Sequence, residues 1–74
     1  MKTDTWRERI VCDPGIRGGE PTIRGTRIPV SGVVANLADM SLDELIVHYP
    51  QLSRDDVRAA ILYAAEAAHN TLVA

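Results

Sequence analysis

The periodicity of the apolar residues changes at Val30, and this change limits the folds open to the 74-residue chain. Before Val30, glycines and prolines crowd residues 13–29 and β-branched residues fill the gaps, which is typical of turns and short strands. After Val30, apolar residues recur at the spacing of amphipathic helices. We therefore expect a single, mainly α domain with a leader at residues 1–8, a β-hairpin segment at 9–30 and a three-helix bundle at 31–74.

Two turns are predicted in the β segment. Residues 9–12, RIVC, are typical of a short strand, and residues 13–16, DPGI, predict the turn that closes it. Pro14 fixes φ at the second position of that turn, and Gly15 is expected to supply a positive φ at the third. Residues 18–30, GGEPTIRGTRIPV, then predict a hairpin with strands at 21–24 and 27–30, joined by a type II′ turn at Gly25 and Thr26.

The predicted hairpin places two arginines opposite each other. Its register pairs Arg24 with Arg27, and like charges directly opposite each other destabilise a strand pair unless an anion meets them. A DNA phosphate or a partner's carboxylate would serve; the alternative is that both side chains are simply solvated. One face would carry Pro21, Ile23, Ile28 and Val30, and the other Thr22, Arg24, Arg27 and Pro29. The candidate partner- or anion-binding residues are Arg17, Arg24, Thr26 and Arg27.

Three serines mark the starts of three predicted helices. Ser31 is expected to cap a helix that runs to about residue 38. Ser41 and Glu44 form a capping box, and Pro50 ends the helix that follows. Ser53 is expected to cap a third, longer helix with two aspartates in its first turn, where the helix dipole favours negative charge. The residues expected to face inward are Val34, Leu37 and Ala38, then Leu42, Leu45, Ile46 and Tyr49, and finally Val57, Ala60, Ile61, Ala64 and Ala68.

Two short helices followed by a longer one resemble a homeodomain-like trihelical bundle, in which the last two helices form a helix-turn-helix. The third helix would then read DNA, with Ser53, Arg54 and Arg58 as candidate DNA-binding residues. Asp55 and Asp56 oppose this interpretation because they lie at the end that would meet phosphates. The basic first half, with six cations against four anions in residues 1–30, would have to supply much of the grip. The alternative is a three-helix core with solvated charges.

The chain is small for a self-sufficient core, which favours association with a second copy. A domain of this length buries only about 60% of the surface of its unfolded chain. Its single cysteine, Cys12, cannot form an internal disulfide and is interpreted as an inert, partly buried residue. The alanine-rich segment 59–74 is apolar on more than one side, so we expect a homo-oligomer, most simply a dimer. The alternative is a loose C-terminal tail.

No catalytic or metal-binding pattern is present in the sequence. His48 and His69 lie 21 positions apart without the spacing of metal ligands, and Gly18-Gly19 lacks the context of a phosphate-binding loop. No signal peptide and no apolar run of about 20 residues is visible. We therefore expect a cytoplasmic protein that is not an enzyme, has no cofactor or metal, and does not bind membranes.

Two stretches resemble a known family. DPGIRGGEPTIRGTRIPV, followed by MSLDELIVHYPQLSRDDVRAAILYA, is similar to the bacterial uncharacterised-domain family numbered 433 over residues 9 to about 66. The most specific parts are the Arg-Gly-Thr-Arg core and the Tyr-Pro turn between two helices. The chain departs from the family pattern at Glu20, where Lys is more frequent, and at Asp39-Met40, where a Gly commonly precedes the next helix.

The resemblance implies a VapB-like antitoxin, encoded beside a PIN-like ribonuclease toxin. Such a protein would be a trihelical oligomer that binds its own operator DNA and holds the nuclease inactive. Because a PIN-like nuclease holds its metal ions with clustered carboxylates, Arg24 and Arg27 could neutralise it by binding those carboxylates. Two other classes stay open: a stand-alone DNA-binding regulator, and an interaction or adaptor protein that binds no DNA.

Overall fold

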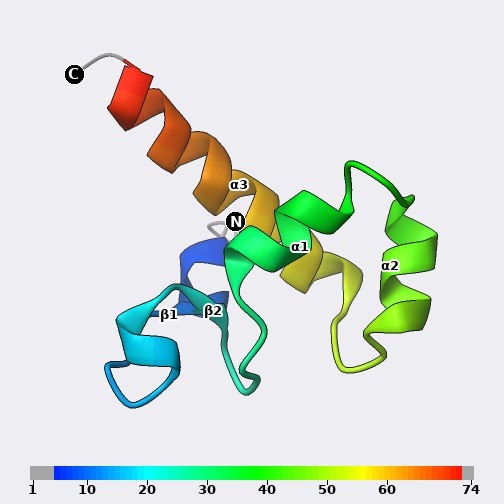
Figure 1. Ribbon diagram of the computed structural model, residues 1–74, viewed down its shortest axis with the longest axis horizontal. Coiled ribbons are helices and arrows are strands. Elements are labelled where there is room, and N and C mark those ends of the chain that lie inside the picture. Colours follow the sequence, from blue (N-terminus) through cyan, green and yellow to red (C-terminus); the bar gives the residue numbers. More distant parts are fainter. Residues whose placement is uncertain (1–4, 73–74) are drawn as a thin grey trace.

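The computed structural model describes residues 5–72 and consists of three helices beside a very small sheet (Figure 1). This confirms the prediction of a mainly α fold with a short N-terminal β segment. The elements are the 3-10 helix η1 (Trp6–Arg9), strand β1 (Ile10–Val11), the 3-10 turn η2 (Arg17–Gly19), strand β2 (Thr22–Ile23), and the helices α1 (Val30–Asn36), α2 (Leu42–His48) and α3 (Arg54–Leu72).

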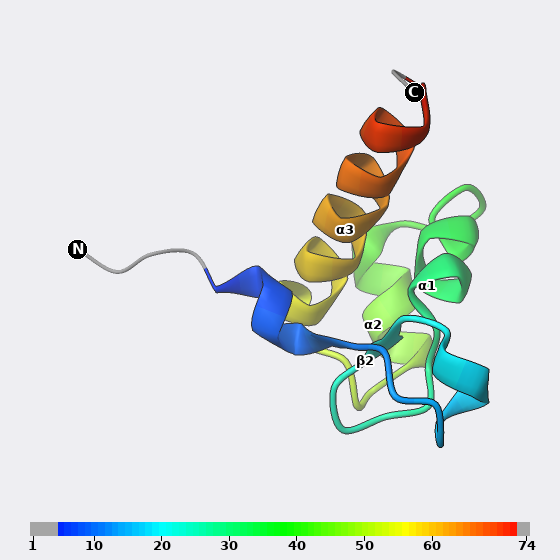
Figure 2. The same ribbon diagram turned by 90° about the vertical axis from the view of Figure 1, so that its left-hand side faces the viewer.

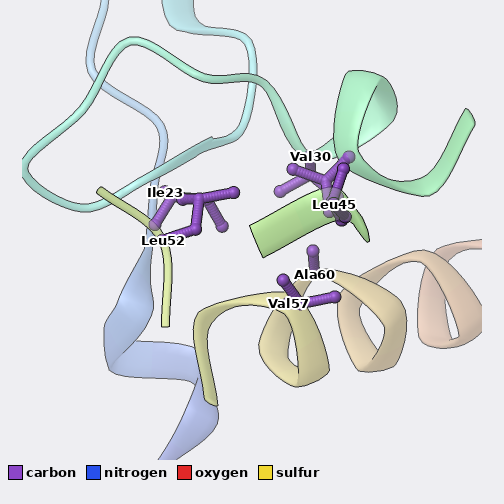
Figure 3. Packing of buried hydrophobic residues seen from close by; sticks show 7 residues of the cluster. Ile23, Val30, Leu45, Leu52, Val57 and Ala60 are labelled. Carbon is purple, nitrogen blue, oxygen red and sulfur yellow. The ribbon is translucent and has the colours of Figure 1, made fainter. Parts of the chain in front are cut away.

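The three helices and the sheet share one small core. Figure 3 shows Val57 and Ala60 pointing from α3 toward Leu45 of α2 and Val30 of α1. Strand β2 contributes Ile23, which is 1% exposed, so the core also fixes the turn that follows this residue. The buried cluster consists of Ile23, Val30, Val33, Leu45, Leu52, Val57 and Ala60.

The predicted caps of α2 and α3 are confirmed. The Ser41 hydroxyl accepts a hydrogen bond from the Glu44 N–H (3.1 Å), and the Glu44 carboxylate accepts one from the Ser41 N–H (2.8 Å). Ser53 and Asp56 form the same reciprocal pair at the start of α3, at 3.1 and 3.0 Å. The inward face of α2 is also as predicted: Leu45 is buried, and the neighbouring residues Leu42, Ile46 and Tyr49 pack partly buried against the core.

The prediction for α1 is wrong in its cap and partly wrong in its inner face. The helix begins at Val30, with Pro29 as the flanking residue, so Ser31 lies inside the first turn and does not cap it. The Ser31 hydroxyl instead donates to the Glu20 carboxylate (3.1 Å). Starting at Val30 turns Val30 and Val33 inward, leaving Val34 and Leu37 half-buried and Ala38 exposed.

The inward stripe predicted for α3 is correct only in its first half. Val57 and Ala60 are buried, Ala64 is half-buried, and Ile61 is 45% exposed. Ala68 is exposed as well, because α3 extends beyond the other elements (Figure 2). Ala59, which was not predicted to face inward, is fully buried: η1 and β1 pack against a second side of the helix.

The strand predicted at residues 9–12 exists, but it pairs with β2. The two strands are antiparallel, with Ile10 opposite Ile23 and Val11 opposite Thr22. On its other edge Thr22 forms a single bridge to Pro29, which follows the predicted hairpin register. Thr22 was predicted on the polar face and is instead fully buried, because β1 lies beside it and its hydroxyl can donate to the Val11 carbonyl (3.3 Å).

The two predicted turns form with different backbone geometry. In the first, the Asp13 carboxylate accepts from the Gly15 N–H (2.8 Å), and Gly15 is not among the described residues with positive φ. The prediction of a positive φ at Gly15 is therefore wrong. In the second turn, the Thr26 N–H donates to the Ile23 carbonyl (3.0 Å), so the turn consists of residues 23–26. Gly25 is the third of these residues and has φ 82°, as in a type II turn and not in the predicted type II′ turn.

The N-terminal helix η1 lies against α3, so part of the expected leader at residues 1–8 belongs to the folded domain. The Arg7 guanidinium lies 4.5 Å from the centre of the Trp6 ring and forms an ion pair with Glu66 of α3. Residues 1–4 of the expected leader lie outside the described residues.

Candidate partner-binding surface

The turn between β2 and α1 is held by the hydroxyl of Thr26. This hydroxyl donates to the Ile23 carbonyl (2.8 Å) and accepts from the Ile28 N–H (3.0 Å). Because both interactions are with the backbone that enters and leaves the turn, Thr26 acts here as a positioning residue. The consequence is a well-defined backbone between the two arginines that flank Gly25 and Thr26.

Arg24 and Arg27 are both exposed on this turn. They are not directly paired as predicted, because the type II turn puts Arg24 at its second position and leaves Arg27 beyond it. The Arg24 N–H donates to the Arg9 carbonyl (2.8 Å), and its guanidinium donates to the Glu8 carbonyl. Within the described part of the chain neither guanidinium has a carboxylate partner, so both charges are available to an anion.

Several other arginines are already neutralised. Arg7 pairs with Glu66 and Arg54 with Asp43, and both of these arginines are 64% exposed at the side chain. Arg9 contacts two aspartates and Arg17 contacts Glu20, as described below. Arg24 and Arg27 differ from these four arginines because they have no carboxylate partner within the described residues.

Arg9 connects the turn to the start of α3. Its backbone carbonyl accepts from Arg24, while its guanidinium donates to Asp56 (2.9 Å) and lies 3.7 Å from Asp55. The two aspartates that were expected to repel phosphates are therefore paired with a cation from η1. Sequence analysis missed this role because the pairing joins residues 47 positions apart. Figures 1 and 2 both place the turn and the loop before α3 at the same end of the molecule.

The predicted DNA-binding residues occupy the N-terminal half of α3 and the residue before it. Ser53 uses its hydroxyl in the cap, and Arg54 pairs with Asp43 of α2. Arg58 is exposed one helical turn further along. The structure thus brings Arg54 and Arg58 onto one helix beside the Arg9 network, with Arg54 already partnered inside the protein.

Arg17 belongs to a separate network that ties η2 to α1. Its guanidinium donates to Glu20 (3.0 Å), and Glu20 also accepts from Ser31. The hydrogen bonds from Arg17 and then from Ser31 hold the pKa of Glu20 below its ordinary value of 4.5. Arg17 has φ 51°, a conformation that is unusual for a residue other than glycine. The structure does not place Arg17 on the Arg24–Arg27 turn.

Cys12 lies beside Tyr63 in a shallow pocket that sequence analysis did not predict. The pocket has a volume of about 190 Å³, and Cys12 is exposed rather than partly buried. Burial, and then the neighbouring Cys12 thiol, raise the pKa of the Tyr63 hydroxyl above 10. The residues that line this pocket are Trp6, Arg7, Ile10, Cys12, Tyr63 and Glu66.

Two further findings concern metal ions and membranes. Among the described residues, no group of three or more His, Cys, Asp or Glu side chains could hold a metal ion. In the same part of the chain, no helix is both long enough and apolar enough to cross a membrane.

Comparison with known proteins places the chain in a family. The model of "Protein of unknown function (DUF433)" matches residues 10–64. The uncharacterised protein y4eO of Sinorhizobium fredii is 39% identical over 59 residues, which cover 78% of this chain and 27% of that protein. The chain thus spans about a quarter of the length of this curated relative, and no solved structure matches. The match covers most of the chain, including the turn with Arg24 and Arg27, and the protein therefore belongs to the DUF433 family.

Proposed function

We propose that this protein is the antitoxin of a type II toxin–antitoxin pair, and that it neutralises a PIN-like ribonuclease through Arg24 and Arg27. The observation that carries the proposal is the presence of two exposed arginines, without carboxylate partners in residues 5–70, on a turn that Thr26 holds in place. Guanidinium groups bind carboxylates with two parallel hydrogen bonds, and the metal site of such a nuclease consists of clustered carboxylates. The protein would act as a cytoplasmic inhibitor without catalytic activity, cofactor or metal of its own.

We also propose that the protein binds its operator DNA through a homeodomain-like helix-turn-helix formed by α2 and α3. Arg54 and Arg58 would lie toward the DNA on α3, and Arg24 and Arg27 would contact phosphates from the adjacent turn. The Arg9 ion pairs support this proposal, since they reduce the repulsion that Asp55 and Asp56 would exert on phosphates. Nuclease and DNA would then compete for the arginines of the turn.

Co-purification tests the antitoxin proposal. The chain is expressed with the product of the neighbouring gene, and only that product carries an affinity tag. We expect a stable complex whose ribonuclease activity is masked and returns when the untagged chain is stripped off under denaturing conditions and the nuclease is refolded. A tagged nuclease that purifies alone and fully active would refute the proposal.

Salt dependence separates the DNA-binding alternatives. A stand-alone regulator would bind its own promoter with an affinity that falls steeply with salt, because phosphate contacts release counterions. An adaptor protein would show no shift of that promoter at any salt concentration. The two arginines of the turn, which have no carboxylate partner in residues 5–70, favour the regulator over the adaptor as second candidate.

A further inference from the structure

The two arginines of the turn differ in how the protein holds them. The Arg24 backbone N–H donates to the Arg9 carbonyl (2.8 Å), and the Nε–H of its guanidinium donates to the Glu8 carbonyl. Within the described residues, the Arg27 side chain forms no hydrogen bond and no ion pair. Arg24 is therefore held both at its backbone and at its guanidinium, whereas nothing in this part of the chain restrains the Arg27 side chain.

The two carbonyls that hold Arg24 belong to η1, which lies against α3 (Figure 2). Arg9, the last residue of η1, donates to Asp56 (2.9 Å) and lies 3.7 Å from Asp55, both in the first turn of α3. Strand β1 follows η1 directly and pairs with β2. The backbone that carries the two carbonyls is thus anchored to α3 on one side and to the sheet on the other.

A guanidinium held by its Nε–H still has two terminal nitrogens with which to bind an anion. Its N–H groups lie in one plane with fixed geometry, so the bond from Nε also restricts the direction of the terminal nitrogens. These two nitrogens form a fork that donates to both oxygens of a carboxylate. A lysine has a single ammonium group on a flexible chain, so it cannot divide the two tasks between separate atoms. The contact with Glu8 therefore prepares Arg24 for a carboxylate in a way that positive charge alone does not reproduce.

We propose that Arg24 is the specificity-determining residue of the turn, and that η1 positions it to receive one carboxylate on its two terminal nitrogens. The inference rests on the proposed function, in which this carboxylate belongs to the nuclease. Because η1 restricts the Arg24 side chain before binding, less conformational entropy is lost when the carboxylate binds. Arg27 adds positive charge without a fixed geometry. Arg9 is a positioning residue for this contact, since it acts on the carboxylate through Arg24.

Exchange of the arginine Nε–H protons with water, measured by NMR, tests the positioning in the chain alone. The Arg24 Nε–H should exchange about fivefold or more slowly than the Arg27 Nε–H, because only the former is hydrogen-bonded. Arg9→Ala should bring the Arg24 rate closer to the Arg27 rate. Arg7→Ala is the matched control: it removes another exposed ion pair between η1 and α3, but its carbonyl does not hold Arg24, so the Arg24 rate should not change. Equal rates for Arg24 and Arg27 in the wild type would overturn the proposal without any use of the nuclease.

Calorimetry with the tagged nuclease tests the specificity, using variants that keep the charge. Arg24→Lys is expected to weaken binding about tenfold or more, and Arg27→Lys only about threefold. An equal or larger effect of Arg27→Lys would overturn the proposal. A wild-type chain that does not bind the nuclease would instead refute the proposed function, and the exchange rates would still decide whether η1 positions Arg24.

A double-mutant cycle separates positioning from a general loss of structure. Arg9→Ala should weaken nuclease binding in the wild type and have little further effect in the Arg24→Lys background, because its role depends on Arg24. A loss of the same size in both backgrounds would show that Arg9 acts without Arg24 and would overturn its role as a positioning residue. Far-UV circular dichroism confirms that each variant keeps its helices.

Discussion

Replacing Gly25 by alanine tests the geometry of the turn that presents the two arginines. Gly25 has φ 82°, and a side chain added there would meet nothing within 4 Å. The cost of Gly25→Ala is therefore backbone strain alone, without a steric clash. We expect a loss of about 1 kcal/mol in the free energy of unfolding, the usual penalty for an L-residue in the left-handed region. For a domain of this size that corresponds to a fall of about 4–8 °C in Tm.

Gly15→Ala provides the matched control. Gly15 does not have positive φ, and an added methyl group would lie 3.4 Å from the Asp13 carboxylate, an ordinary contact. Alanine restricts the unfolded chain more than glycine does, so we expect no loss or a gain of up to about 1 kcal/mol. Urea unfolding followed by circular dichroism measures both variants. If Gly15→Ala destabilised the protein as much as Gly25→Ala, the assignment of the two turns would be refuted.

Three further substitutions follow from the same structure. Leu45→Ala should cost about 2–5 kcal/mol in urea unfolding because Leu45 is fully buried in the core; a loss below 1 kcal/mol would contradict that packing. Arg9→Ala should cost about 1 kcal/mol or less of stability, since its ion pairs are partly exposed, yet it should weaken promoter binding in a gel-shift titration; unchanged binding would contradict its role at α3. Because the pKa of Glu20 is lowered, its network stabilises the protein above the ordinary pKa of 4.5, and this contribution disappears as pH falls through the lowered value. In Glu20→Gln, the free energy of unfolding should therefore fall less steeply as the pH is lowered below 4.5 than it does in the wild type. The same pH dependence in both proteins would show that the Glu20 network does not contribute to acid stability.

Local signals in the sequence predicted the α2 and α3 helices well. At the start of each helix, a serine and the acidic residue three positions later accept hydrogen bonds from backbone N–H groups of the same turn. This cap needs no contact with a distant part of the chain. The α1 start was mispredicted because Pro29, in an extended conformation, takes the N-cap position, so the helix begins two residues earlier than a Ser31 cap would place it. Ser31 then bonds Glu20, a residue that the sequence does not place nearby.

The turns and the sheet depend on contacts between residues far apart in the sequence. The glycine-first rule predicted a type II′ turn, but Ile23 is fixed in the core and Thr26 bonds the backbone on both sides of the turn. These contacts shift the turn by one residue, so that Arg24 lies inside the turn and Arg27 directly follows it. The partner of β2 was missed because short, β-branched segments carry no signal that says which of them will pair.

The arginines of the candidate surface were found from sequence, but their states of charge pairing were not. The predicted hairpin register marks Arg24 and Arg27 as unusual, and the structure adds that they lack carboxylate partners in the described residues. Arg9 was missed because its role depends on ion pairs with Asp55 and Asp56, which are far from it in the sequence. Ion pairs of this kind depend on tertiary placement, and no periodicity in the sequence encodes them.

The affinity of the chain for the tagged nuclease, measured by calorimetry, tests the central proposal most directly. Arg24→Ala combined with Arg27→Ala is compared with Arg7→Ala combined with Arg54→Ala, which removes two exposed arginines that already have carboxylate partners. Loss of a buried charge pair at an interface costs about 2 kcal/mol or more, so the first variant should bind about thirtyfold or more weakly. The second should bind within about threefold of the wild type. Equal affinities for the wild type and the Arg24/Arg27 variant would contradict the proposed role of the turn.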